Sequence, residues 1–408
     1  MTATAISTQC CIAGGGPAGM MLGLLLARAG VRTVVLEKHA DFLRDFRGDT
    51  IHPSTLEIML ELRMLDDFLK LPHQKVSRLS ARFGDASFAI ADFSRLATRC
   101  KYIAMMPQWD FLNFLATHAV RYPCFALHMD AAVTGLIEEG GRVVGARAVS
   151  ARDGAFEVRA DLVVGADGRH STVREAAGLR VETLGAPMDV MWFRLPRRSD
   201  DPVETAGRFD AGRVFIMINR DDYWQCAYVI PKGSADEVRR RGLDAFRAGV
   251  AEAAPFLHDR VAAIASWDDA KLLTVQVDRL PRWFRPGVLC IGDAAHAMSP
   301  IGGVGVNLAV QDAVAAANLL AAPLRDGRLT EVHLRRLQKR RERPTRTTQR
   351  LQVFLQNRVV APALGGAAGL RAPLAVRLMQ RLPLLQRLPA RLIGIGVRPE
   401  HVRSPASL

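Results

Sequence analysis

The sequence predicts an α/β fold: a Rossmann-like nucleotide-binding domain with an inserted mixed β-sheet domain and a helical C-terminal region. Three observations support this prediction. A strand, a glycine-rich turn, a helix and a second strand follow one another from Gln9 to Glu37. Two further apolar strands, ending near Gly165 and Ile291, each run into a turn that contains glycine and aspartate. Between these turns, residues 186–231 form the longest run of strand-like segments, as expected for an inserted sheet.

The first turn reads GGGPAG from Gly14 to Gly19 and lies between an apolar strand and an apolar helix. Gly14 lets the chain turn tightly, Gly16 lets the backbone approach a pyrophosphate, and Gly19 lets the helix pack closely on the sheet. The free N–H groups and the dipole of the helix attract phosphate charge. Glu37 ends the second strand, where a ribose hydroxyl pair would be bound. Together these features predict dinucleotide binding rather than an ordinary βαβ turn.

Length and composition are those of a soluble enzyme. With 408 residues the chain can hold about two to three domains, and 49% of its residues are hydrophobic. Residues 1–27 carry no charge, but they lack the basic start of a signal peptide and contain the glycine turn. We interpret them as the buried first strand and helix, and we expect no membrane span.

The cysteines and the net charge exclude some classes of protein. Six cysteines form no CxxC pair and no ligand spacing with the ten histidines, so we expect reduced thiols, no metal and a cytoplasmic protein. The net charge of +14 comes largely from arginines spread along helices, without an aromatic-interleaved basic motif. A solvated basic face, or attraction for anionic cofactors and acidic surfaces, explains it at least as well as a nucleic-acid partner, which we do not expect.

Helices and strands alternate through the first half of the chain. Pro53 begins a predicted helix that extends to about residue 69, and short strands are predicted over 76–104. A helix is predicted over 108–119. Glycine-containing turns then join three strands over 132–159, which predicts a small meander.

The carboxyl-terminal part is predicted to be mainly helical. A charged helix is predicted over 235–253, and an apolar helix over 308–320 follows the third turn. The helix predicted over 331–356 is strongly basic, so we expect it to lie on the outside, with Pro344 interrupting it. In the remaining tail, prolines and glycines separate short apolar pieces studded with arginine. The tail either packs on its own domain, which the prolines favour, or contacts a membrane surface peripherally.

Three turns, at Gly14, Asp167-Gly168 and Gly292-Asp293, all follow apolar strands. In an α/β sheet the carboxyl ends of the strands form the edge where ligands bind. Taken together and in this order, the three turns resemble the FAD-binding aromatic-ring monooxygenases, the para-hydroxybenzoate hydroxylase-like family of group A flavoprotein monooxygenases. The resemblance extends to about residue 320, and it implies that the nucleotide domain binds FAD.

The resemblance implies a role for individual residues. The first turn would hold the FAD pyrophosphate, Glu37 would bind the adenosine ribose, and Arg47 matches an arginine that contacts FAD. Gln108 matches a glutamine near the ribityl chain. Asp167 belongs to a motif that touches FAD and the nicotinamide donor, and Asp293 matches the aspartate on the ribityl hydroxyls. The residues predicted to bind the cofactor are Gly14, Gly16, Pro17, Ala18, Gly19, Glu37, Lys38, Arg47, Gln108, Asp167, Gly292, Asp293, Pro300, Gly303, Val304, Gly305, Val306 and Asn307.

The segment 300–307 is similar to the family's loop along the isoalloxazine ring. Backbone N–H groups at the start of the following helix would face the N1–C2=O edge of the flavin, where negative charge collects on reduction. The family loop often carries glutamine where this chain has Val304. The backbone role survives that change, but a side-chain contact at this position does not.

Three turns far apart in the sequence can reach one cofactor only if the FAD-binding domain is discontinuous. We predict that this domain comprises residues 1–72, 97–182 and 271–357, that 73–96 and 183–270 form the substrate-binding sheet domain, and that 358–408 form a helical tail. We expect a monomer or a homodimer.

The resemblance implies an enzyme that uses NADH or NADPH and O₂ to hydroxylate a phenolic or polycyclic aromatic small molecule through a flavin C4a-hydroperoxide. The cofactor supplies the chemistry, while the protein positions the aromatic ring and excludes water. Large side chains on the strands of 186–231 could line the substrate pocket or fill the core. These are Trp192, Phe215, Met217, Trp224 and Tyr228.

A phenol is activated by losing its proton, so a proton acceptor is wanted nearby. His52 and His296 are the candidate catalytic bases, although a histidine beside a helix start is often only hydrogen-bonded. A reductase or dehydrogenase of the same fold is the main alternative function. Halogenases often carry a Trp-x-Trp-x-Ile-Pro run, and here Cys226 and Tyr228 stand at the tryptophan positions, so halogenation ranks low.

Overall fold

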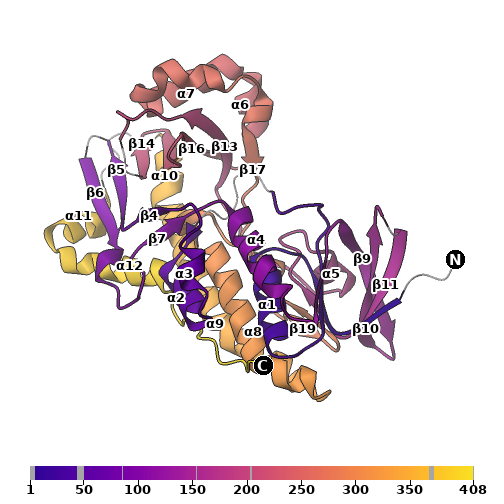
Figure 1. The fold of residues 1–408 in the computed structure, drawn as a ribbon. Helices are drawn as coiled ribbons and strands as arrows, with labels where there is room; N and C mark the ends of the chain where they lie inside the picture. Colours follow the sequence, from indigo (N-terminus) through magenta and orange to yellow (C-terminus); the bar gives the residue numbers. More distant parts are fainter. Residues whose placement is uncertain are drawn as a thin grey trace.

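The computed structural model describes residues 5–43, 50–84, 86–152, 154–202, 205–366 and 372–407. Two large sheets lie in different parts of the molecule, and the long helices α8 (Gly305–Arg325) and α9 (Glu331–Leu355) run below the second sheet in Figure 1. This arrangement confirms the predicted α/β class. The other helices are α1 (Pro17–Arg28), α2 (Pro53–Glu61), α3 (Leu65–Phe68), α4 (Gln108–Ala119), α5 (Thr172–Ala176), α6 (Ala235–Arg240), α7 (Leu243–Ala253), α10 (Ala361–Leu364), α11 (Leu374–Arg381) and α12 (Arg387–Gly394).

The first sheet has eight strands, with the central order β19-β20-β11-β1-β2-β8. The pairs β20–β11, β11–β1, β1–β2 and β2–β8 are parallel, as expected of a Rossmann-like sheet. Its strands are β1 (Ala5–Ala13), β2 (Thr33–Leu36), β8 (Phe125–His128), β9 (Ala131–Glu139), β10 (Arg142–Ser150), β11 (Gly154–Gly165), β19 (Phe284–Arg285) and β20 (Val288–Cys290).

Strand β11 combines two elements that the sequence suggested were separate. The third strand of the predicted meander and the strand that ends at Gly165 form one strand of 12 residues. Its first half is antiparallel to β10 and alternates in burial. Its last four residues lie between β1 and β20 and are all buried. The pattern changes within one strand because its neighbours change, and a fully buried strand need not alternate.

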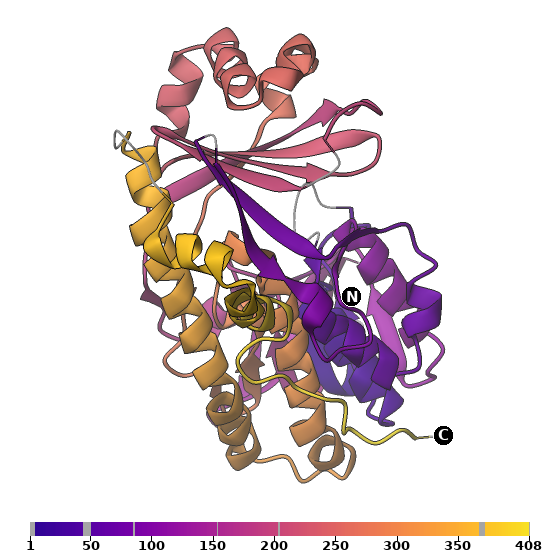
Figure 2. The same ribbon diagram turned by 90° about the vertical axis from the view of Figure 1, so that its left-hand side faces the viewer.

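The second sheet has seven strands in the order β17-β13-β16-β15-β14-β5-β6. Figure 2 shows it between an outer layer, formed by α6 and α7, and the rest of the chain. Two smaller sheets have three strands and two strands. The strands are β5 (Arg78–Phe83), β6 (Ala86–Asp92), β13 (Met188–Pro196), β14 (Ala206–Asp210), β15 (Arg213–Asn219), β16 (Tyr223–Pro231) and β17 (Lys271–Leu273); the small sheets are β3 (Thr50–Ile51), β4 (Gln74–Val76) and β7 (Ile103–Met105), and β12 (Glu182–Thr183) and β18 (Asp278–Arg279).

Helix α8 is the central helix of the core. Together with the turn before it, Ile301–Arg325 is long and apolar enough to cross a membrane, but 78% of its most apolar stretch is buried inside the protein. It packs against α1 on one side and α9 on the other. Burial of this kind is typical of a core helix in a globular protein.

Helix α9 differs from its prediction in two respects. It continues through Pro344 without a break, and one of its faces is buried rather than solvated. Buried contacts of Arg341 and Gln349, on either side of the proline, hold the helix in place. A proline removes only one backbone donor, so such anchoring contacts can keep the helix continuous.

Candidate functional site

The structure brings the three glycine turns together at one edge of the first sheet. Ala13 pairs with Gly165, and Gly165 pairs with Cys290, so β1, β11 and β20 end side by side. Gly14 has a φ of +102°, and a Cβ there would lie 2.5 Å from the carbonyl oxygen of Ala166 in the second turn. A Cβ on Gly292 would lie 3.1 Å from the Cβ of Ala18. The first turn therefore contacts the second turn, and the third turn contacts the helix that follows the first turn.

The first turn has the shape of a phosphate cradle. A Cβ on Gly19 would overlap the carbonyl oxygen of Gly14, whereas a Cβ on Gly16 would meet nothing within 4 Å. Pro17 occupies the first turn of α1, and the first hydrogen bond of this helix joins Met20 N to Gly16 O. The earlier amides point out of the N-terminus of the helix, where they can bind an anion. The open space at Gly16 is where such an anion would fit.

Glu37 is buried and fixes the first turn to the end of β2. Its Oε2 accepts a hydrogen bond from Gly15 N at 2.7 Å, and its Oε1 accepts one from His39 N at 3.1 Å. Lys38 is exposed beside it. Gln108 begins α4, which packs against α1. Arg47 lies outside the described residues.

The second and third turns use their aspartates differently. The carboxylate of Asp167 accepts hydrogen bonds from Ser171 Oγ and Val173 N, so it holds the start of α5. Burial raises the pKa of Asp167. Asp293 is partly exposed, and its Oδ2 lies 3.5 Å from the Nη2 of Arg169.

The loop 300–307 is held against the start of α2. Gly303 has a φ of +62°, and its carbonyl oxygen accepts a hydrogen bond from Thr50 Oγ1 at 2.8 Å. Asn307 Oδ1 accepts bonds from His52 N at 3.1 Å and from Thr55 Oγ1 at 2.6 Å. The side-chain nitrogen of Asn307, Nδ2, is buried without a hydrogen-bond partner among the described residues. Such an orphaned donor fits the polar edge of a bound ring, beside the first amides of α8.

Sequence reasoning missed a row of glutamines, on α9 and just after its end, that binds this loop and the segments beside it. Gln349 Nε2 donates to the carbonyl oxygens of Asp278 and Ala297. Gln352 exchanges hydrogen bonds with the backbone of Ser299, and the next polar residue on the same face, Gln356, donates to Ser299 Oγ. Their spacing of three and four residues puts them on one helix face, and this spacing could have revealed them.

His296 lies in the core, beside Asp312 of α8. Its Nε2 lies 2.6 Å from the Oδ2 of Asp312, whose Oδ1 accepts a bond from Arg341 Nε at 2.8 Å. All three side chains are almost completely buried. Burial alone would raise the pKa of Asp312, but His296 and Arg341 offset this and lower it. Asp312, rather than its sequence neighbour Asp293, binds His296, and the role of His296 as a base stays a prediction.

His52 lies beside the loop and is also fully buried. Its Nδ1 donates to the carbonyl oxygen of Ile393 at 2.7 Å, so a residue of α12 fixes its ring. Burial lowers the pKa of His52 to about 4, although the bond to Ile393 partly offsets this. His52 is consequently neutral near pH 7. Because it lies beside the loop, it remains the better placed of the two histidines for the predicted role of a base.

The large side chains of the second sheet divide between its two faces. Phe215, Met217, Trp224 and Tyr228 pack in the core beneath α7, on the face away from the loop. Trp192 lies on the opposite face, in clusters that include Ile301 of the loop. Successive side chains of a strand point to opposite faces of the sheet, so each residue contributes to one face only. Four of the five side chains therefore fill the core, which was the other interpretation of them, and Trp192 is the one on the face toward the loop.

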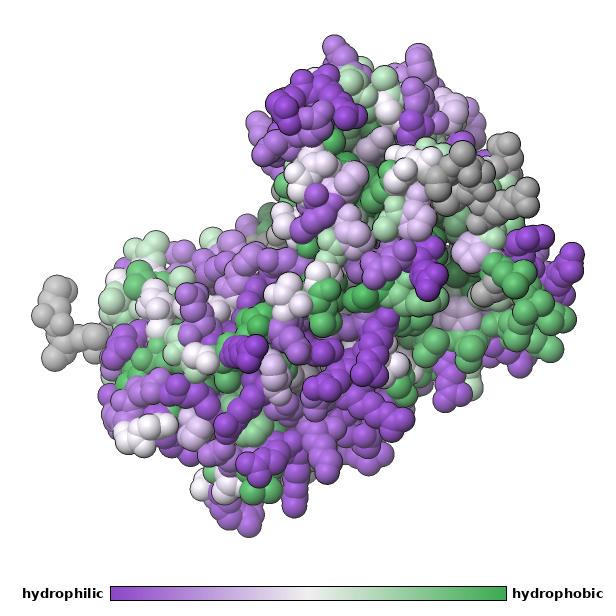
Figure 3. Space-filling model, turned by 180° about the vertical axis from the view of Figure 1, so that it is seen from behind, coloured by the Kyte–Doolittle hydropathy of each residue, from purple (hydrophilic) through white to green (hydrophobic). Residues whose placement is uncertain are grey.

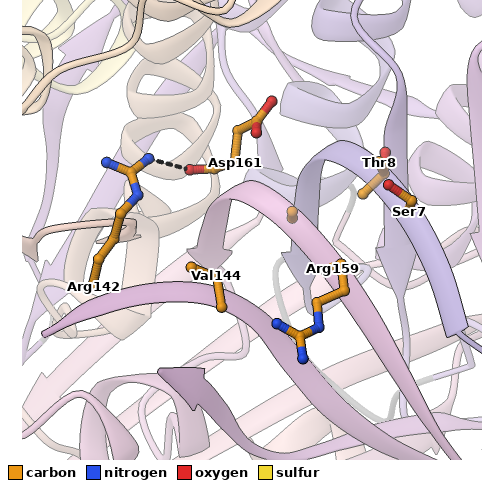
Figure 4. A pocket seen from close by; sticks show the side chains of 7 residues that line it. Ser7, Thr8, Arg142, Val144, Arg159 and Asp161 are labelled. Carbon is orange, nitrogen blue, oxygen red and sulfur yellow. Dashed lines mark hydrogen bonds between the residues drawn. The ribbon is translucent and has the colours of Figure 1, made fainter. Parts of the chain in front are cut away.

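A separate surface hollow of about 270 Å³ lies at the other end of β1 (Figure 4). Arg142 there donates to the carbonyl oxygen of Asp161, and Arg159 is paired with Glu139. Its cations are already partnered, and it lies several residues before Gly14 on an extended strand. This hollow is consequently not part of the candidate site.

Comparisons with known proteins agree with this geometry. A family model described as an FAD binding domain matches residues 7–351. The 6-methylpretetramide 4-monooxygenase of Streptomyces rimosus is 33% identical over 403 residues, which cover 97% of this chain and 94% of that protein. The chain belongs to the FAD-dependent aromatic monooxygenases.

Solved structures extend the comparison. OxyS anhydrotetracycline hydroxylase from Streptomyces rimosus is 26% identical, with a TM-score of 0.75, covering 96% of this chain and 77% of that chain. The myxobacterial chondrochloren halogenase CndH has a TM-score of 0.76, but at 17% identity over 95% of this chain and 92% of that chain it shows the fold alone. The residues around the three turns suit FAD: a phosphate cradle at Gly16, an acid at Glu37 and free donors at the start of α8.

In this family the bound flavin supplies the redox chemistry. The chain's own residues bind and orient it. The amides before Met20 would hold its phosphates, and the first amides of α8 with the Asn307 side chain would face its ring.

Proposed function

We propose that this monooxygenase hydroxylates a polycyclic, phenolic small molecule and takes its electrons from NADH or NADPH. The observation that carries this proposal is the 33% identity to a 6-methylpretetramide 4-monooxygenase across almost the whole of both chains. That span includes the second sheet and the tail, not only the nucleotide fold. OxyS, whose solved structure covers 96% of this chain, also acts on an anhydrotetracycline.

The site residues are part of this proposal. We assign the FAD pyrophosphate to the first turn, the adenosine ribose to Glu37 and the ribityl chain to Gln108 and Asp293. The proposed domain division follows the two sheets except at β17 (Lys271–Leu273), which lies beyond the proposed boundary at 270 but pairs with β13 in the second sheet. It is supported by strands β5 and β6, which precede most of the first domain in sequence but belong to the second sheet, where β5 pairs with β14 and β6 pairs with β5.

We place the aromatic substrate beside Trp192, between the second sheet and the loop. The indole nitrogen of Trp192 is buried without a hydrogen-bond partner among the described residues. Trp192 also packs near Met105, whose strand pairs with Thr50, and Thr50 binds the loop. An unpaired buried donor is costly, so a polar group of a substrate would satisfy it.

A screen of substrate-stimulated NADH and NADPH oxidation tests the function. Polycyclic phenols should stimulate both cofactor oxidation and oxygen consumption, and isotopically labelled O₂ should appear in the product. A reductase would oxidise the nicotinamide and reduce the substrate without incorporating the label. Product formation that requires chloride or bromide would favour a halogenase. Either outcome would overturn hydroxylation.

A further inference from the structure

Six leucines near the carboxyl terminus stand out from the protein surface, with exposed fractions from 40% to 78%. Arginines alternate with them along α11, the turn Pro383–Gln386 and α12. Figure 3 shows an apolar patch at the right-hand edge, where these two helices lie. We call this the leucine-arginine surface; it comprises Leu374, Leu378, Leu382, Leu384, Leu385 and Leu388 with Arg377, Arg381, Arg387 and Arg391.

The opposite faces of the same helices are firmly packed. Ala390 and Ile393 of α12 join the cluster around Phe93, and Ala372 and Val376 join the cluster around Phe83. Both helices contact β6. The leucines are therefore exposed although the tail is packed against the rest of the protein. The packing of the inner face fixes the leucines and arginines outward.

The charge of this region is of one sign. Between Glu342 and Glu400 the sequence holds ten arginines and no lysine or acidic residue. A twofold dimer through this surface would place arginines against arginines, which opposes self-association. Nucleic-acid binding would make no use of the leucines, and no aromatic residue for base stacking follows Phe354.

Leucines and arginines on one outward face match the interface of an anionic bilayer. There the apolar side chains enter the boundary between headgroups and acyl chains, and the guanidinium groups bind lipid phosphates. The surface forms an outer edge of the molecule rather than a groove, so it suits a deformable surface better than a protein ridge. We propose that the leucine-arginine surface docks this enzyme peripherally on an anionic lipid membrane. This inference is independent of the substrate.

Sedimentation with phospholipid vesicles tests the proposal. The FAD-loaded protein should sediment with vesicles of phosphatidylcholine mixed with phosphatidylglycerol. It should sediment much less with phosphatidylcholine alone, and high salt should release it. No sedimentation with the anionic vesicles, or equal sedimentation with both kinds, would overturn the proposal.

Paired variants locate the surface. Reversal of two charges, Arg377→Glu with Arg381→Glu, should lower the vesicle affinity by about tenfold or more. Arg335→Glu with Arg336→Glu on the exposed side of α9 is the matched control and should change it much less. An equal loss in the control would show that net charge, not this surface, is responsible.

The leucines are tested separately. Leu384→Ser with Leu388→Ser should also weaken binding, whereas Val332→Ser, which is exposed on α9, should not. Flavin content and the thermal midpoint confirm that each variant is folded. Light scattering measures the oligomeric state and so tests whether a second copy of the chain binds this surface instead. A wild-type dimer that these leucine substitutions convert to monomer would overturn the membrane proposal.

Discussion

Acidification should destabilise the protein through His52. The pKa of this buried ring is lowered from 6.5 to about 4 by burial. As the pH falls below 6.5, the unfolded chain takes up a proton that the folded protein refuses, so stability is lost between pH 6.5 and 4. The difference corresponds to about 3 kcal/mol in full, and about 2 kcal/mol of it is lost between pH 7.5 and pH 5.

Urea unfolding at pH 7.5 and pH 5, with saturating FAD, measures this loss. In His52→Asn the amide can still donate to the carbonyl oxygen of Ile393, but no group titrates, so the variant should lose about 2 kcal/mol less than the wild type over this range. His170 is exposed, and His170→Asn serves as the control that should behave as wild type. An identical pH dependence in the wild type and His52→Asn would refute the reasoning.

Three further variants test other parts of the site. Asp312→Ala removes the buried carboxylate shared by His296 and Arg341, leaving Arg341 only its longer pair with Glu400, and should cost about 3–5 kcal/mol of unfolding free energy. The surface variant Asp326→Ala should cost about 1 kcal/mol or less. Gly19→Ala should abolish FAD retention, because its Cβ would overlap a backbone carbonyl oxygen. Trp192→Phe removes one buried donor and should raise KM about tenfold, measured as substrate-stimulated NAD(P)H oxidation, while Trp267→Phe in the outer layer should not.

Each of these has a contrary outcome. Equal losses in the two aspartate variants would mean that the buried network contributes no more than a surface pair. A yellow Gly19→Ala protein would show that the first turn relaxes around a methyl group. An unchanged KM for Trp192→Phe, at unchanged flavin content, would move the substrate away from that indole.

The first βαβ unit could be predicted in detail because local geometry determines its residues. Gly14 needs a positive φ and Gly19 needs a close backbone contact, and few other residues satisfy either requirement. The order of the three turns could be predicted for the same reason. Their positions at one sheet edge follow from parallel strands, which end together.

The side-chain partners were less predictable because they come from distant segments. His296 is close to Asp293 in sequence, but its partner is Asp312 on the next helix. Arg341 looked like one of many solvated arginines, although it lies 1% exposed beside that carboxylate. Composition shows how many arginines a helix has, but not which of them faces a buried acid.

The sequence also did not show which side chains of the second sheet point to which of its two faces. Both faces are apolar, one beneath α7 and one toward the loop, so alternation could not tell which set faces the substrate. For Trp224 and Phe215 both a pocket position and a core position were therefore open, and the structure packs them in the core. Only the packing partners separate them from Trp192.

Titration of FAD into the flavin-free protein tests the central claim, that the three turns hold one cofactor, most directly. We predict saturable binding by the wild type and affinity about tenfold to a hundredfold lower in Asp293→Ala. Asp268→Ala, at an exposed aspartate of the second sheet's outer layer, should bind as the wild type does. Absence of FAD binding by the wild type, or undiminished affinity in Asp293→Ala, would contradict the convergence of the turns on a flavin.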